Sequence, residues 1–171
     1  MPGPHTDDNR ESGPGSFDNL FERYHDAVFR QIVLMMGRNA PGADDVSQET
    51  WLRVSRSLQT FEGRSGFYAW VCRIAGNEVK RWWGRHKRPM VVKDDPMLDP
   101  REGQERDDLV HEALRRLPDE FRQTLVLELW EGLSVREIAE AMGLPEGTIK
   151  SRLFRARERF KTAWLELGGE A

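Results

Sequence analysis

The residues best suited to chemistry lie near the end of the chain, in the stretch LSVREIAEAMGLPEGTIKSRLFRARERFK at 133–161. Ser134 and Glu137 have the spacing of a capping box, which predicts the start of a helix. Gly143 and Pro145 predict a sharp turn into a second helix. A short helix, a tight turn and a second helix with a polar outer face are typical of a unit that enters a DNA major groove.

The predicted second helix has two faces. At about 100° per residue, one face carries an apolar stripe, namely Ile149, Leu153, Ala156 and Phe160. The opposite face carries the predicted DNA-contacting residues, which are Thr148, Lys150, Ser151, Phe154 and Arg155. A phenylalanine among hydrogen-bond donors is unusual on a solvated face and reasonable on one that contacts bases. An ordinary helical hairpin with a charged exterior is the alternative.

A second candidate surface lies in FYAWVCRIAGNEVKRWWGRHKR, residues 67–88. Its polar and aromatic residues recur every three or four positions along one side of a predicted helix: Trp70, Arg73, Asn77, Lys80 and Arg81. Aromatic rings stack on unpaired bases while Lys and Arg hold the phosphates, so this mixture suits single-stranded DNA. The alternative is that the tryptophans, Trp82 and Trp83 above all, belong partly to the core.

A third candidate surface is acidic. Its residues, Asp44, Asp45, Gln48 and Glu49, fall in the first turns of a predicted helix and precede Arg53 and Arg56. Acidic side chains favour a helix N-terminus through the helix dipole, which explains some of them without any partner. The remainder suit a surface that pairs with basic groups of another protein.

The composition narrows the function classes. The 171 residues carry a net charge of −3, but 61–90 holds seven Lys and Arg against two Glu, and 146–161 holds six against two. Two basic segments on an acidic chain suggest two separate contacts with phosphate. The single Cys72 excludes an internal disulfide, fits a reducing compartment and is expected to be a small core residue rather than a redox sensor. We find no signal peptide, membrane span, catalytic constellation or metal-ligand spacing, so we expect no enzyme activity, no cofactor and no metal.

The pattern predicts an all-α chain of two small helical domains joined by a flexible linker. Residues 1–15 are expected to form a disordered tail. Helices over 16–36, 43–58 and 67–85 make a first domain at 16–88. Three prolines and many acids predict the linker at 89–107. Helices near 109–117 and 119–130, followed by the helix-turn-helix, make a second domain at 108–167.

Three blocks in this order resemble the bacterial RNA polymerase sigma-70 family, in its extracytoplasmic-function group (group 4). GADDVSQETWLRV resembles the helix that docks on the β′ clamp helices of the polymerase. FYAWVCRIAGNEVKRWW resembles the segment that opens and reads the −10 element, and LPDEFRQTLVLELWEGLSVREIAEAMGLPEGTIKSRLFRARERF resembles the domain that reads the −35 element. The resemblance covers about 17–88 and 108–165.

The resemblance implies a dissociable specificity subunit with a three-helix promoter-melting domain and a four-helix helix-turn-helix domain. Binding to core polymerase would fall to Asp45, Gln48, Glu49 and Arg53. Contacts with the −10 element would fall to Arg64, Ser65, Trp70, Arg73, Asn77, Lys80 and Arg81, and contacts with the −35 element to the outer face of the last helix. The implied partners are core RNA polymerase, through its β′ clamp helices and β flap, promoter DNA and an anti-sigma factor. The implied location is cytoplasmic, and on the nucleoid when polymerase-bound.

Two other readings remain open at this point. A stand-alone helix-turn-helix regulator would explain the second domain but not the acidic helix or the aromatic-basic helix. A helical adaptor that binds only protein would not explain Phe154 and Arg155 on an outer face. A sigma factor is distinguished from both alternatives by whether its DNA binding requires core polymerase.

Overall fold

The computed structural model describes residues 16–37, 40–63, 65–86 and 102–170, and within these ranges all regular secondary structure is helical, with no strand. This confirms the predicted all-α class. The helices are α1 (Phe17–Met36), α2 (Ala43–Ser57), α3 (Phe67–Arg85), α4 (Glu102–Arg115), α5 (Asp119–Leu129), α6 (Val135–Met142) and α7 (Glu146–Glu166), with a short 3-10 turn at Leu58–Thr60.

Local sequence signals explain where the helix-turn-helix begins and turns. The Ser134 hydroxyl accepts a hydrogen bond from the Glu137 amide at 3.2 Å, and the Glu137 carboxylate accepts one from the Ser134 amide at 2.9 Å. The predicted capping box is therefore present at the start of α6. Gly143 ends α6 with a φ of 64°, a left-handed conformation that favours glycine. Pro145 stands immediately before α7.

Helix α4 begins earlier than the sequence pattern suggested. Its first residue, Glu102, lies inside the predicted linker at 89–107. The three prolines that indicated a linker all precede this position, and the segment that follows is rich in Glu, Gln and Arg, which favour helix. The predicted tail at 1–15 and the linker residues 89–101 lie outside the described residues.

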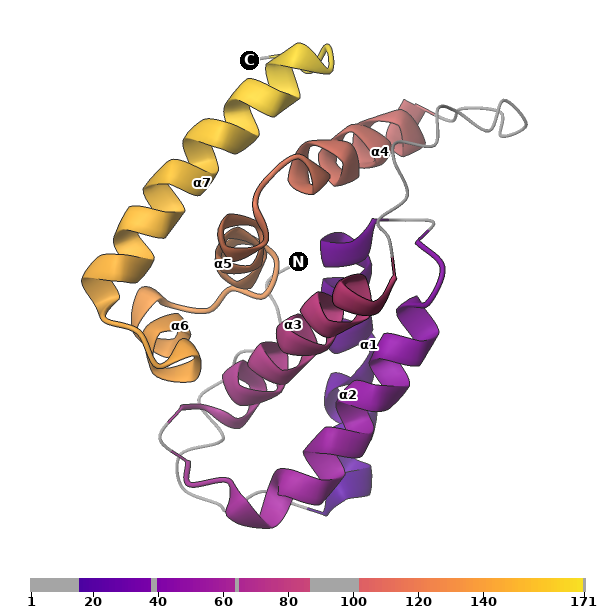
Figure 1. Ribbon diagram of the computed structural model, residues 1–171, viewed down its shortest axis with the longest axis vertical. Helices are drawn as coiled ribbons and strands as arrows, with labels where there is room; N and C mark the ends of the chain where they lie inside the picture. Colours follow the sequence, from indigo (N-terminus) through magenta and orange to yellow (C-terminus); the bar gives the residue numbers. More distant parts are fainter. Residues whose placement is uncertain (1–15, 38–39, 64, 87–101, 171) are drawn as a thin grey trace.

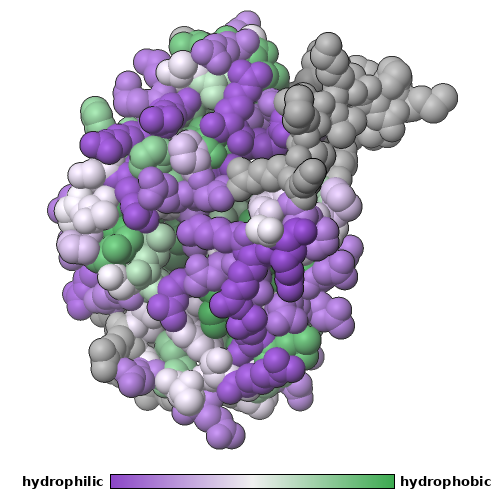
Figure 2. Space-filling view, in the orientation of Figure 1, coloured by the Kyte–Doolittle hydropathy of each residue, from purple (hydrophilic) through white to green (hydrophobic). Residues whose placement is uncertain are grey.

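Helices α1 and α3 of the first half pack directly against α4, α5 and α6 of the second half. Helix α5 lies between α7 and the first-half helices α1 and α3, and α3 also contacts α6 (Figure 1). Buried residues of both halves form one continuous core, in which Val28 and Val71 join Leu125 and Ile138. The two predicted domains thus share an interface. The face seen in Figure 2 is largely hydrophilic, with hydrophobic residues in small separate patches.

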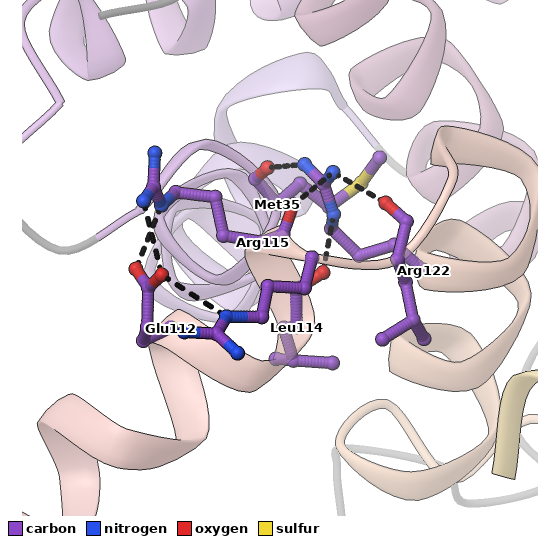
Figure 3. Close-up of polar contacts among 7 residues, drawn as sticks. Met35, Glu112, Leu114, Arg115 and Arg122 are labelled. Atoms are coloured by element: carbon purple, nitrogen blue, oxygen red, sulfur yellow. Dashed lines mark hydrogen bonds and ion pairs between the residues drawn. The ribbon is translucent and has the colours of Figure 1, made fainter. Parts of the chain in front are cut away.

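Arg122 of α5 makes a polar link between the halves. Its buried guanidinium donates to the carbonyl oxygens of Leu114, Leu117 and Arg115, at 2.9, 2.8 and 3.2 Å, all in the second half. It also donates to the carbonyl of Met35, at 2.6 Å, near the end of α1 (Figure 3). The last carbonyls of a helix have no partner within the helix, so one side chain satisfies helix ends from both halves.

A second buried link joins α3 to the turn before α6. The Tyr68 hydroxyl donates to the carboxylate of Glu131, which has no solvent exposure. Burial raises the pKa of Glu131, although the hydrogen bond from Tyr68 and the charge of Arg30 act to lower it. Burial also raises the pKa of Tyr68, to which the nearby Cys72 and Glu131 add. Tyr68 is therefore a neutral donor at any physiological pH.

Candidate nucleic-acid and partner interfaces

The outer face of α7 carries the predicted −35 residues. The stripe of Ile149, Leu153 and Ala156 is buried, as the sequence predicted. On the opposite side Phe154 keeps 67% of its surface exposed, an unusually high value for a large apolar side chain. Lys150, Ser151 and Arg155 are exposed with it, while Thr148 is half-buried. The structure therefore gathers the predicted set on one accessible face.

Four cations of α7 near the predicted DNA-contacting face differ in their partners. Arg152 and Arg157 turn back to α5, where they pair with Glu120 at 3.3 Å and Glu128 at 2.6 Å. Lys150 makes only a long contact with Glu146, at 3.9 Å, and within the described part of the chain Arg155 has no ion-pair partner. Of the predicted −35 residues, Lys150 and Arg155 are thus cations that remain available to phosphates or base edges.

The free side of α3 carries most of the predicted −10 residues. Trp70, Arg73 and Lys80 are half-buried and Asn77 is exposed. Trp70 packs against Phe61 and Phe67, with ring centroids 4.9 and 5.6 Å away. Neighbouring aromatics hold the indole in place, which favours stacking because little rotamer freedom is left to lose.

The other residues considered on and beside α3 have different outcomes. Ser65 is buried, with 7% of its surface exposed, so in this conformation its hydroxyl is not available to a ligand. Arg64 lies outside the described residues. Trp82 is buried and Trp83 half-buried, which supports the alternative that these tryptophans are partly core.

The exposed ridge of α2 carries the predicted polymerase-binding residues. Asp45 and Gln48 are exposed, and Glu49 is half-buried. All three line a hollow of about 230 Å³ between α2 and α3, whose far wall includes Glu78, Trp82 and Arg85. Arg53 lies beside the ridge and pairs with Glu49 at 3.5 Å. The structure therefore brings these four predicted residues together on one surface.

Sequence reasoning missed two features of this region. Glu78 is a buried carboxylate that pairs with both Arg53 and Arg81, but the sequence pattern placed it only on a neighbouring side of the helix.

A groove of about 500 Å³ runs between α1 and α2, lined by Phe17, Phe21, Phe29, Trp51 and others. The spacing of four between aromatic rings along α1, at Phe17, Phe21, His25 and Phe29, is the sequence signal that was available for this groove.

The described residues were also compared with the requirements of a metal site and of a membrane-spanning helix. Among the described residues, no three His, Cys, Asp or Glu side chains lie close enough to hold a metal ion. None of the described helices has the length and apolar character that crossing a membrane requires.

The fold and these surfaces define an all-helical protein built around a helix-turn-helix. Residues 20–89 match the model of sigma-70 region 2, and residues 107–160 match the model of sigma-70 region 4. The chain is 34% identical to the RNA polymerase sigma-H factor of Pseudomonas aeruginosa over 91% of this chain and 90% of that protein. It is 32% identical to the extracytoplasmic-function (ECF) RNA polymerase sigma-E factor of Haemophilus influenzae over 84% of each.

Solved structures show the same fold. CnrH in complex with the cytosolic domain of CnrY is similar with a TM-score of 0.66 and 23% identity, over 85% of each chain. RpoE in complex with the anti-sigma factor NepR from Bartonella quintana is similar with a TM-score of 0.66 and 23% identity, over 86% of this chain and 95% of that one. The chain belongs to the sigma-70 family, in its extracytoplasmic-function group, and acts as a sigma factor.

Proposed function

We propose that this sigma factor binds core RNA polymerase through α2 and directs it to promoters by reading two DNA elements. Helix α7 enters the −35 major groove, and the free side of α3 takes the unwound non-template strand of the −10 element. The accessible outer face of α7 carries the proposal, since Phe154, Lys150 and Arg155 stand out from a helix whose opposite side is buried. Lysine and arginine contacts to guanine are the commonest base-specific contacts.

The −10 step depends on stacking and phosphate contacts. Unstacking bases costs a few kcal/mol, which the captured bases must offset. Stacking on an aromatic side chain contributes about 1–3 kcal/mol per base, and Trp70 combines neighbouring aromatic contacts with partial exposure. Arg73 and Lys80 have no ion-pair partner among the described residues, so both can hold the strand's phosphates.

We propose that docking on the polymerase uses the α2 ridge. Asp45 and Glu49 would pair with basic groups of the β′ clamp helices, while Gln48 donates and accepts hydrogen bonds between them. An antagonist is also expected, because a free specificity subunit would redirect polymerase continuously. The apolar groove between α1 and α2 supports a protein partner of this kind, since it joins the docking ridge.

In vitro transcription with purified core polymerase on a pooled promoter library tests the proposal. Transcripts that share two spaced upstream elements, and appear only when this protein is added, are the expected result. The proposal fails if core transcription is unchanged while the protein alone shifts duplex DNA, because a stand-alone regulator would behave in that way.

A further inference from the structure

Glu78 is the only acidic residue of α3 and is almost completely buried, with 3% of its side chain exposed. A carboxylate on a helix that contacts phosphates weakens that contact, and burying it costs free energy unless cations compensate. Two arginines do so through the same carboxylate oxygen. Arg53 of α2 pairs with Oε1, and Arg81 of α3 donates to it at 3.0 Å.

These pairs extend into a chain of four charges that joins two surfaces. Arg53 also pairs with Glu49 on the α2 ridge, at 3.5 Å. The ends of the chain are open to partners, since 39% of the Glu49 side chain and 52% of the Arg81 side chain are exposed. The order is Glu49, Arg53, Glu78 and Arg81, so the network begins at the proposed polymerase site and ends at the proposed −10 site.

We propose that Glu78 is a positioning residue that couples polymerase docking on α2 to DNA binding by Arg81. The inference rests on the proposed function of those two surfaces. A basic group of the polymerase that binds Glu49 competes with Arg53 for it. Arg53 then relies on Glu78 alone, draws its carboxylate away from Arg81, and leaves Arg81 free for a phosphate. Coupling of this kind is reciprocal, so DNA binding by Arg81 also favours polymerase docking.

The hollow between α2 and α3 gives the partner access to this network. Glu49 and Glu78 line it from opposite walls, together with Asp45. A basic side chain that enters from the α2 ridge therefore meets Glu49 first and lies beside Glu78.

The test measures binding of a fluorescent −10 non-template single strand, with and without core polymerase. In the absence of polymerase, Glu78→Gln releases Arg81, so affinity is expected to rise about threefold to tenfold at low salt, with a log–log salt slope steeper by about 0.7 for one more phosphate contact. The polymerase-dependent gain in affinity is expected to shrink by the same factor. In an Arg81→Gln background, Glu78→Gln is expected to have no further effect.

One control and one further test variant separate coupling from a simple change of charge or loss of structure. Glu128→Gln removes a carboxylate of α5 that pairs with Arg157 and is not a member of this network, and it is expected to leave strand binding within twofold of the original. Glu49→Gln on the surface is expected to raise strand affinity without polymerase, as Glu78→Gln does. If Glu78→Gln does not fold, the strand affinity of Glu49→Gln tests the coupling instead.

Unchanged affinity in both Glu78→Gln and Glu49→Gln would overturn the inference, as would an increase that persists when Arg81 is Gln. Failure of the proposed function would give a different result. If the proposed function is wrong, the original protein itself binds neither core polymerase nor the single strand.

Discussion

Tyr68 and Glu131 are 63 positions apart, yet the tyrosine hydroxyl donates directly to the glutamate carboxylate inside the core. One residue belongs to α3 and the other precedes α6, so the bond ties the two sequence regions of the sigma factor together. The bond is a buried polar contact between the two halves, which the sequence predicted to be separate domains. Its contribution to the free energy of unfolding can be measured.

The raised pKa of Glu131 is expected to make the free energy of unfolding depend on pH. Burial raises its pKa above the ordinary value of 4.5, so the folded protein holds this proton more tightly than the unfolded chain. The contribution to the free energy of unfolding is therefore full below pH 4.5 and is lost as pH rises through the raised pKa. Urea unfolding of Glu131→Gln across pH 4–8 should lose this downward trend.

Glu112 provides a control of opposite sign. Partial burial acts to raise its pKa, but hydrogen bonds and charges of Arg115 and Arg116 lower it overall. Its contribution is present above pH 4.5 and is lost as pH falls through the lowered pKa. Glu112→Gln should thus change the acid side of the profile only. Identical profiles for the original protein and Glu131→Gln would contradict the assignment.

Removal of the Arg122 side chain is expected to destabilise the fold severely. Arg122→Ala removes the donor to the carbonyls of Met35 in the first half and Leu117 in the second, and each buried carbonyl left unpaired costs about 1–3 kcal/mol. We expect the free energy of unfolding to fall by more than about 3 kcal/mol in a denaturant titration. Arg116→Ala is the matched control, because this exposed arginine makes surface ion pairs worth about 1 kcal/mol or less. Equal losses in the two variants would refute the role of Arg122.

The close contact between α3 and α5 at Gly76 gives a third prediction. A Cβ atom there would lie 1.9 Å from Nε2 of the buried Gln123. Gly76→Ala should therefore cost about 1–3 kcal/mol through overpacking, and Gln123→Ala in the same chain should recover much of it. Gly84→Ala, where a Cβ meets open space on the same helix, should leave stability unchanged or slightly higher. Additive losses in the double variant would contradict the contact.

Cys72 offers a chemical probe of the core. The thiol is fully buried, and burial together with the nearby Glu131 raises its pKa, so little reactive thiolate forms. Under native conditions a thiol reagent such as dithionitrobenzoate should react far more slowly than with the urea-unfolded chain. Equal rates in both conditions would show that the core around Cys72 opens freely.

Recognition by α7 is expected to depend on Arg155 more than on its neighbour Arg157. Loss of one good base contact costs about 1–3 kcal/mol, so Arg155→Ala should weaken binding of a −35 duplex by about that amount. Arg157 is also exposed but pairs with Glu128, so Arg157→Ala is the matched control on the same helix. Fluorescence anisotropy with the promoter duplex measures both. A larger effect at Arg157 would mean that a different face of α7 meets the DNA.

The sequence predicted what depends on local patterns, and missed what depends on distant packing. Ser134, Glu137 and Gly143 act within a few residues of one another, so their spacing was enough to locate α6 and its turn. Arg122 and Glu131 gave no such signal, because their partners lie in other helices and a buried charge looks like a surface charge in a sequence. Ser65 shows the same limit, since a loop serine expected to face DNA is covered by the packing around it.

The link made by Arg122 has a consequence for exchanging parts between related sigma factors. Its guanidinium donates hydrogen bonds to a carbonyl of α1 and to three carbonyls of its own half. A hybrid that joins the first half of this chain to the second half of a relative therefore needs an equivalent donor at this position. A relative without an equivalent donor would leave the end of α1 unsatisfied. The halves are therefore expected to be interchangeable only as co-adapted pairs, even though each carries a separate recognition surface.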